Sequence, residues 1–181
     1  MTSNQLTLQQ VQAVGTVALG NALGLLSDAE TLLEAGQFER AYVLAVFGVE
    51  EFSKLVECRS IVMPGSIVTV AELNRTLRPL GSVHVARFAR ALGFLDEISV
   101  GALSRAFAPD DLATVAKEQL ELRDRALYVE VSPSGVPLGP DDIDRDAAQL
   151  EVRLLIDLFG VMGAALWPDP WKASNDVARD D

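Results

Sequence analysis

The sequence predicts an all-α fold, an up-and-down bundle of four to five helices. The chain of 181 residues is 49% hydrophobic but only 6% aromatic, and side chains of this aliphatic kind suit helix packing better than a β-sandwich. Its apolar residues recur at steps of three and four, which is the period of a helix. The chain shows no repeat of fixed length, so a solenoid is not expected.

Two long helices open the chain. Apolar spacing predicts the first helix over residues 7–35, and Gly36 ends it. At three internal glycines we expect a neighbouring helix to approach closely: Gly15, Gly20 and Gly24. The second helix should cover residues 37–63. Because residues 41–49 are apolar on every side, this is the expected central helix.

Three shorter segments and a loop precede the last helix. A short helix or turn region is predicted over residues 70–77, and helices are predicted over residues 82–100 and 110–128. Prolines and glycines in residues 129–140 predict a short Gly/Pro loop or a small hairpin.

The last helix should begin at the caps Asp141 and Asp142 and end at Trp167, before two prolines. Its apolar stripe is expected to follow Leu150, Leu154, Leu158 and Met162. Residues 1–172 are expected to form a single domain and residues 173–181 a disordered acidic tail.

Charge and composition exclude several classes of function. A net charge of −11 repels a phosphate backbone, so DNA is not an expected partner, whereas RNA stays open through local basic groups. The single cysteine, Cys58, is expected to be a buried thiol and fits a reducing cytoplasm. We find no spacing typical of a metal site or a cofactor loop, no export signal and no membrane span.

The first candidate site lies on the central helix, directly after its apolar run. Glu50 and Lys54 are four residues apart with the acid first, which predicts a partly buried ion pair. This pair could be structural, or it could be functional and line a groove. Glu51 needs a donor from another helix, and Arg123 or Arg125 is expected to supply it.

The second candidate site lies just before the Gly/Pro loop. Arg123 and Arg125 could bind phosphate there, beside Tyr128. The alternative is an ordinary surface, on which Glu121 pairs with Arg125 and Asp124 faces solvent.

His84 is a separate candidate, because it is the only side chain with an ordinary pKa near neutrality. It could act as a general base or contact a ligand, and a structural or exposed role is the alternative.

Three blocks of the sequence resemble the AbiV family of abortive-infection proteins. They are residues 32–45, the run Glu50-Glu51-Phe52-Ser53-Lys54, and residues 123–131 together with 143–147. The AbiV family is placed in the HEPN superfamily. The resemblance therefore implies an HEPN-like helical bundle, frequent homodimers, and a role in limiting phage replication in the bacterial cytoplasm.

The resemblance also implies two kinds of mechanism. Many HEPN proteins are ribonucleases in which an arginine is followed, after four to six residues, by a histidine, in a cleft shared by two subunits. Here Arg123 stands at the arginine position and Tyr128 where the nearest histidine would fall. A phenol with a pKa of about 10 is a poor proton shuttle at neutral pH. AbiV-type proteins can instead arrest phage translation by binding a viral protein.

We therefore expect an antiphage protein that limits phage replication by binding a phage protein or the translation machinery. One alternative is an HEPN-type ribonuclease, in which Arg123 orients the phosphate and Tyr128 or His84 assists. Another is a helical dimerisation module without a defence role. Surplus apolar surface on the central and last helices predicts a homodimer.

Overall fold

The computed structural model describes residues 5–61, 68–77, 83–98, 109–127, 130–131, 137–138 and 143–166. This part of the chain is all-α, as predicted, with six helices and two very short two-stranded sheets. The helices are α1 (Leu8–Glu34), α2 (Phe38–Ile61), α3 (Val70–Leu77), α4 (Val83–Ile98), α5 (Pro109–Leu127) and α6 (Arg145–Leu166). Their positions match the predicted helices to within a few residues at most ends.

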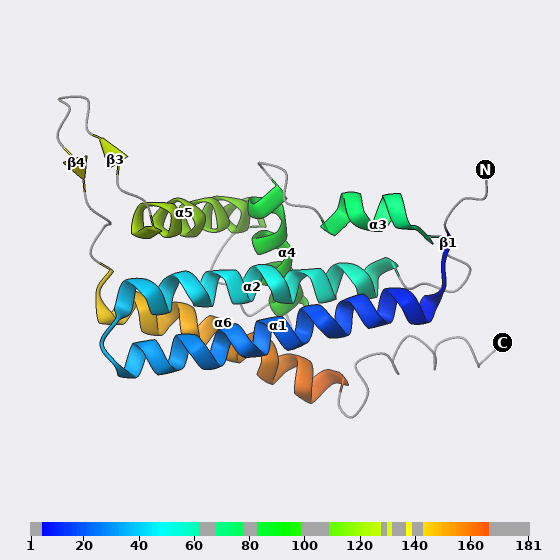
Figure 1. Cartoon of the computed structure of the whole chain (residues 1–181), viewed down its shortest axis with the longest axis horizontal. Helices are drawn as coiled ribbons and strands as arrows, with labels where there is room; N and C mark the ends of the chain where they lie inside the picture. Colours follow the sequence, from blue (N-terminus) through cyan, green and yellow to red (C-terminus); the bar gives the residue numbers. More distant parts are fainter. Residues whose placement is uncertain are drawn as a thin grey trace.

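The first two helices form an antiparallel hairpin (Figure 1). Thr7 caps α1 with a reciprocal pair of bonds: its hydroxyl accepts from the backbone N–H of Gln10 at 3.2 Å, and the Gln10 side chain accepts from the backbone N–H of Thr7 at 2.8 Å. Gly36 has a φ of 72°, a conformation that favours glycine, and turns the chain into α2.

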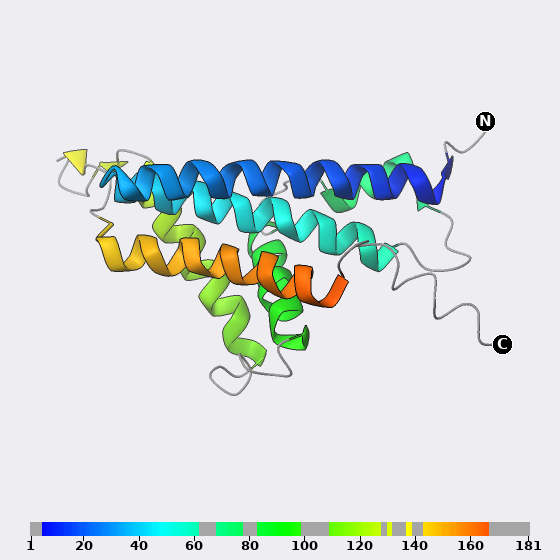
Figure 2. The ribbon, with the colours of Figure 1, turned by 90° about the horizontal axis from the view of Figure 1, so that it is seen from below.

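The central position of α2 is confirmed. Its neighbours are α1, α4, α5 and α6, so apolar residues around its whole circumference are covered within one chain. Figure 2 shows α2 between α1 and α6, with α4 and α5 beyond them. Gly48 lets α6 approach, because a Cβ at this position would overlap the Leu155 side chain.

Two pairs of short strands accompany the helices. β3 (Glu130–Val131) and β4 (Pro137–Leu138) pair antiparallel, which confirms the predicted small hairpin. β1 (Gln5–Leu6) pairs antiparallel with β2 (Val68–Thr69), and this contact was not predicted. No helix among the described residues is long and apolar enough to cross a membrane.

Several details of the predicted helices are wrong or lie outside the described residues. Asp144 caps α6, since its carboxylate accepts from the backbone N–H of Ala147 at 2.8 Å. The expected caps Asp141 and Asp142, Trp167 and the tail lie outside the described residues.

The predicted role of two α1 glycines is also wrong. A Cβ added at Gly20 or Gly24 would meet no atom of the described part of the chain within 4 Å. Both glycines are exposed, so no described helix packs closely against either of them.

Candidate functional site

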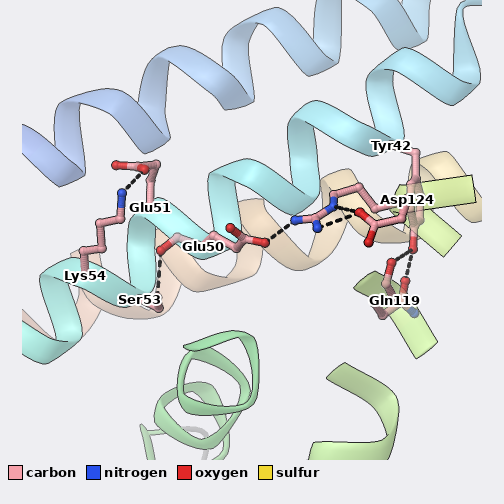
Figure 3. A network of polar contacts seen from close by, with 8 residues as sticks. Tyr42, Glu50, Glu51, Ser53, Lys54, Gln119 and Asp124 are labelled. Atoms are coloured by element: carbon pink, nitrogen blue, oxygen red, sulfur yellow. Dashed lines mark hydrogen bonds and ion pairs between the residues drawn. The ribbon is translucent and has the colours of Figure 1, made fainter. Parts of the chain in front are cut away.

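The candidate site is built around an ion pair between α2 and α5. Arg123 donates from Nη1 to the carboxylate of Glu50, and both side chains are buried. The Ser53 hydroxyl donates to the Glu50 carbonyl at 2.7 Å, one turn along α2. Figure 3 shows Glu50 extending from α2 toward the region of α5 where Asp124 lies.

Other groups complete the surroundings of the Arg123 guanidinium. Its Nε and Nη2 donate to one oxygen of Asp124 at 3.0 and 2.7 Å. The guanidinium carbon also lies 5.2 Å from the ring centroid of Phe47, within the range of a cation–π contact. Arg123 is thus held by two carboxylates and an aromatic ring, with only 8% of its surface exposed.

Glu51 lies on the other side of α2 and faces α1. Lys54 donates to one of its carboxylate oxygens, and Nδ2 of Asn21 donates to the other at 3.4 Å. The side chains of Lys54 and Glu51 are 26% and 21% exposed, so this pair is partly solvated.

The predicted partners of the two glutamates are therefore wrong. Lys54 pairs with Glu51 instead of Glu50, and Arg123 pairs with Glu50 instead of Glu51. Successive residues of a helix differ by about 100° in direction, so only one of two adjacent acids can face α5. Glu50 shares that face with Phe47, whose ring also contacts Arg123.

A pocket of about 530 Å³ opens between α1 and α2 beside the two glutamates. Its α1 wall contains Gly20 and Gly24, whose missing side chains leave it open. Its remaining lining is Asn21, Leu25, Asp28, Phe47, Glu50 and Glu51. Glu50 is paired with Arg123, and Glu51 with Lys54, so the net negative charge of the pocket comes chiefly from Asp28. A net negative charge favours a cationic occupant over an anionic one.

The other predicted site residues do not join this pocket or cannot be placed. Arg125 is exposed on α5 and does not line it. Tyr128 lies outside the described residues, as does the side chain of His84. Glu121 pairs with Lys117 at 3.6 Å, one turn earlier on α5, so its predicted pairing with Arg125 is wrong.

Sequence reasoning missed a second buried polar group, at the crossing of α2, α5 and α6. The Tyr42 hydroxyl donates to the side chain of Gln119. Burial raises the pKa of Tyr42 above its ordinary value, and the nearby charge of Glu151 raises it further. Glu151 is 2% exposed, and its Oε1 has no hydrogen-bond partner among the residues that the structure describes. Burial raises the pKa of this carboxyl to about 8, so it is mostly uncharged at neutral pH.

A third ion pair, also missed, joins α2 to α4. Arg90 donates from Nε and Nη1 to the two carboxylate oxygens of Glu57 at 2.9 and 3.0 Å. Glu57 follows Glu50 by seven residues, so both acids lie on the same side of α2. This spacing of seven residues could have predicted from the sequence that Glu57, like Glu50, faces a neighbouring helix.

These contacts limit the chemistry of the site. Arg123 is buried and already donates three of its five N–H groups to Glu50 and Asp124, so a phosphate that approached it would meet these carboxylates. Among the described residues, no group of three or more histidine, cysteine, aspartate or glutamate side chains could hold a metal ion. The arrangement is better suited to holding helices together and receiving a cationic group than to acid–base catalysis.

The chain matches one family, described as AbiV, whose HEPN_AbiV model covers residues 10–155. No curated protein and no solved structure matches it significantly. The matched region contains α2 and α5 and therefore the whole Glu50–Arg123 contact. With most of its length matched in this way, the chain belongs to the AbiV family of HEPN domains.

Proposed function

We propose that this protein is an abortive-infection antiphage protein that limits phage replication by binding a phage protein or a component of the translation machinery. The observation that carries this proposal is the open, carboxylate-lined pocket between α1 and α2 beside an arginine that is already neutralised. Membership of the AbiV family supports the defence role.

The charges of the pocket favour a protein partner over RNA. Arg123 neutralises Glu50, and Lys54 neutralises part of the charge of Glu51. Asp28 and the partly solvated Glu51 leave the pocket with a net negative charge, which would repel phosphates. A lysine or arginine side chain from a partner could enter beside the Phe47 ring and meet these carboxylates. The partner is therefore expected to present a basic segment.

A plaque assay on a panel of phages tests this proposal. Wild-type protein should protect cells against some phages, and the double variant Glu51→Gln, Asp28→Asn should lose most of that protection. Both changes keep the size of the side chains and remove negative charge from a partly solvated pocket, so the fold should persist. Circular dichroism and thermal unfolding of the purified variant check this.

Glu121→Gln is the matched control, because it removes one negative charge from an exposed position on α5. It should protect as well as the wild type. If the folded pocket variant protects as well as Glu121→Gln, the pocket does not bind the partner and the proposal fails.

A further inference from the structure

A second pocket opens beside the carboxylate-lined one, which we call the acidic pocket. The second pocket has a volume of about 420 Å³ and lies where α1, α2 and the C-terminal end of α5 meet. Six of its eight lining residues are apolar, so we call it the apolar pocket: Leu32, Val43, Leu44, Phe47, Ala126 and Leu127. The other two, Glu39 and Arg40, carry opposite charges. Leu127 is 39% exposed, so part of this apolar lining is open to a partner.

The two pockets are parts of one groove. Phe47 lines both of them, and its side chain is only partly buried. On α1, Leu32 of the apolar pocket follows Asp28 of the acidic pocket by about one helical turn. In Figure 1, α2 lies between α1 and α5, so the groove runs along α2 with α1 as its other long wall. We call the two pockets together the α1–α2 groove.

Both walls of the groove give the same distance between its two pockets. On α2, Leu44 of the apolar pocket and Glu51 of the acidic pocket are seven residues apart. On α1, Leu32 of the apolar pocket and Leu25 of the acidic pocket are also seven residues apart. Seven residues of a helix span about 10 Å. An occupant that fills both pockets must therefore place two groups about 10 Å apart.

The α1 wall permits the close approach of a helix from a partner. Gly20 and Gly24 line the acidic pocket and are exposed, and a Cβ added at either would meet no atom of the described residues within 4 Å. Glycine weakens a helix relative to alanine, and no described helix of this chain uses the space beside these two. A groove between two long helices can receive a third, whose backbone would come close at the glycines.

The charges of the groove define the polar part of the occupant. Lys54 neutralises only part of the charge of Glu51, and Asp28 is exposed. Figure 3 shows Glu51 on the side of α2 that faces α1, where the acidic pocket opens. A lysine or arginine would be attracted to this end of the groove, whereas a phosphate or an acidic segment would be repelled.

We propose that the partner inserts one short amphipathic helix into the α1–α2 groove. A large apolar side chain of this helix occupies the apolar pocket, and a lysine or arginine two turns away meets Asp28 and Glu51. The inference rests on the proposed function, because it names the part of the partner that the acidic pocket receives. It goes further by making the apolar pocket a second contact of the same helix.

Model peptides test this inference without phage. A peptide of about 20 residues, rich in alanine and glutamine and long enough to be helical, carries one leucine and one arginine seven positions apart. It is titrated into isotope-labelled protein, and binding is followed by NMR. The amide signals of Asp28, Leu32, Phe47 and Glu51 should shift together. The dissociation constant should be about 0.1–1 mM, because few groups are buried.

A second peptide of the same composition is the matched control. Its arginine follows the leucine by five positions, which places the two side chains on different faces of the helix. Only one of the two pockets can then be filled at a time. This peptide should bind at least tenfold more weakly than the first.

Variants of the protein assign each peptide side chain to its pocket. The double variant Asp28→Asn, Glu51→Gln should weaken the first peptide about tenfold, but it should hardly affect a peptide with glutamine in place of the arginine. Leu127→Gln changes an exposed position of the apolar pocket and should weaken every peptide that carries the leucine. Leu150→Gln is its matched control on α6, because Leu150 is also exposed, and it should weaken none.

Several results would overturn the inference. They are equal binding of the two peptides, no binding at millimolar concentration, and binding that Leu127→Gln leaves unchanged. Peptide binding that appears only as the protein is diluted would assign the groove to a second copy of the chain. Shifts of the same signals with an RNA oligonucleotide, and none with the peptide, would assign it to RNA.

Failure of the proposed function gives a different result. The double variant Asp28→Asn, Glu51→Gln would then still protect cells in the plaque assay, although the first peptide binds the groove of the wild-type protein. If that variant loses protection but the two peptides bind equally, the acidic pocket receives the partner and the helix with two contacts is wrong.

Discussion

Glu50 of α2 and Arg123 of α5 form a buried ion pair between residues 73 positions apart in the sequence. The pair connects the central helix α2 to α5. Its arginine, Arg123, is the residue that stands at the arginine position of the HEPN ribonuclease motif. Because water is excluded from both side chains, each depends on protein groups to satisfy its charge.

Breaking this pair from one side should strongly destabilise the protein. Arg123→Met removes the cation and leaves the Glu50 carboxylate buried without it, so the free energy of unfolding should fall by about 3–5 kcal/mol. Urea denaturation measures the loss. The double variant Glu50→Met, Arg123→Met should recover much of it, whereas Lys117→Ala, which breaks an exposed pair, should cost less than about 1 kcal/mol. A single variant as stable as the wild type would contradict a structural role for the pair.

The contact between α2 and α6 should be sensitive to one methyl group. Gly48→Ala places a Cβ against the Leu155 side chain, so we expect a loss of about 1–3 kcal/mol in unfolding free energy. In a protein that already carries Leu155→Ala, Gly48→Ala should cost less unfolding free energy than it does in the wild type. Thermal or urea unfolding of the four proteins measures both costs. Additive effects of the two changes would mean that the residues do not touch.

Glu151 should make stability depend on pH. Its pKa is about 8 in the folded chain and about 4.3 when the chain is unfolded. Between these values the folded state holds a proton that the unfolded state has released, so this contribution to stability is complete at low pH and is lost as pH rises to about 8. Urea unfolding at pH 5.5, 7 and 8.5 measures it.

Glu151→Met provides the comparison for that experiment, since it removes the titrating group and keeps an unbranched side chain. The variant should gain stability relative to the wild type as pH rises. Other titrating groups are common to both proteins and cancel in the difference. A stability difference that does not change with pH would show that Glu151 is ionised, or paired, across the whole range.

Cys58 should be chemically inert in the folded protein. Burial and, to a lesser extent, the nearby charge of Glu57 raise the pKa of its thiol to about 11, so very little reactive thiolate exists at neutral pH. A colourimetric thiol assay should detect almost no reaction under native conditions and one thiol per chain in denaturant. Rapid modification of the native protein would mean that this part of α2 opens easily.

The helices could be predicted from the sequence because their signals are local. Apolar spacing predicts the position of α2, and Gly36 predicts the turn before it. The pairing of β1 with β2 could not be predicted, since two residues of strand carry no periodic pattern and their partners lie about 60 positions away.

The candidate site could be predicted only in part. The sequence indicated that acids of the central helix would meet an arginine near residue 123, but not which acid, because that depends on the rotation of α2 about its axis. The same uncertainty affected the prediction for α6. Leu150 is exposed, whereas Leu154 is partly buried and Leu158 is buried as predicted. The buried residues of this helix are Ala148, Glu151, Val152, Leu155 and Leu158. The burial of Glu151 could therefore be recognised only after the buried face of α6 was known.

The state of cellular RNA during a protected infection tests most directly whether this protein acts by binding a partner. Total RNA from infected cells that carry the wild-type protein should show intact ribosomal and transfer RNA on a denaturing gel while phage production falls. Specific RNA fragments that appear on infection and vanish in a folded Arg123→Lys variant would contradict the account, because they would make the Arg123 region a ribonuclease site.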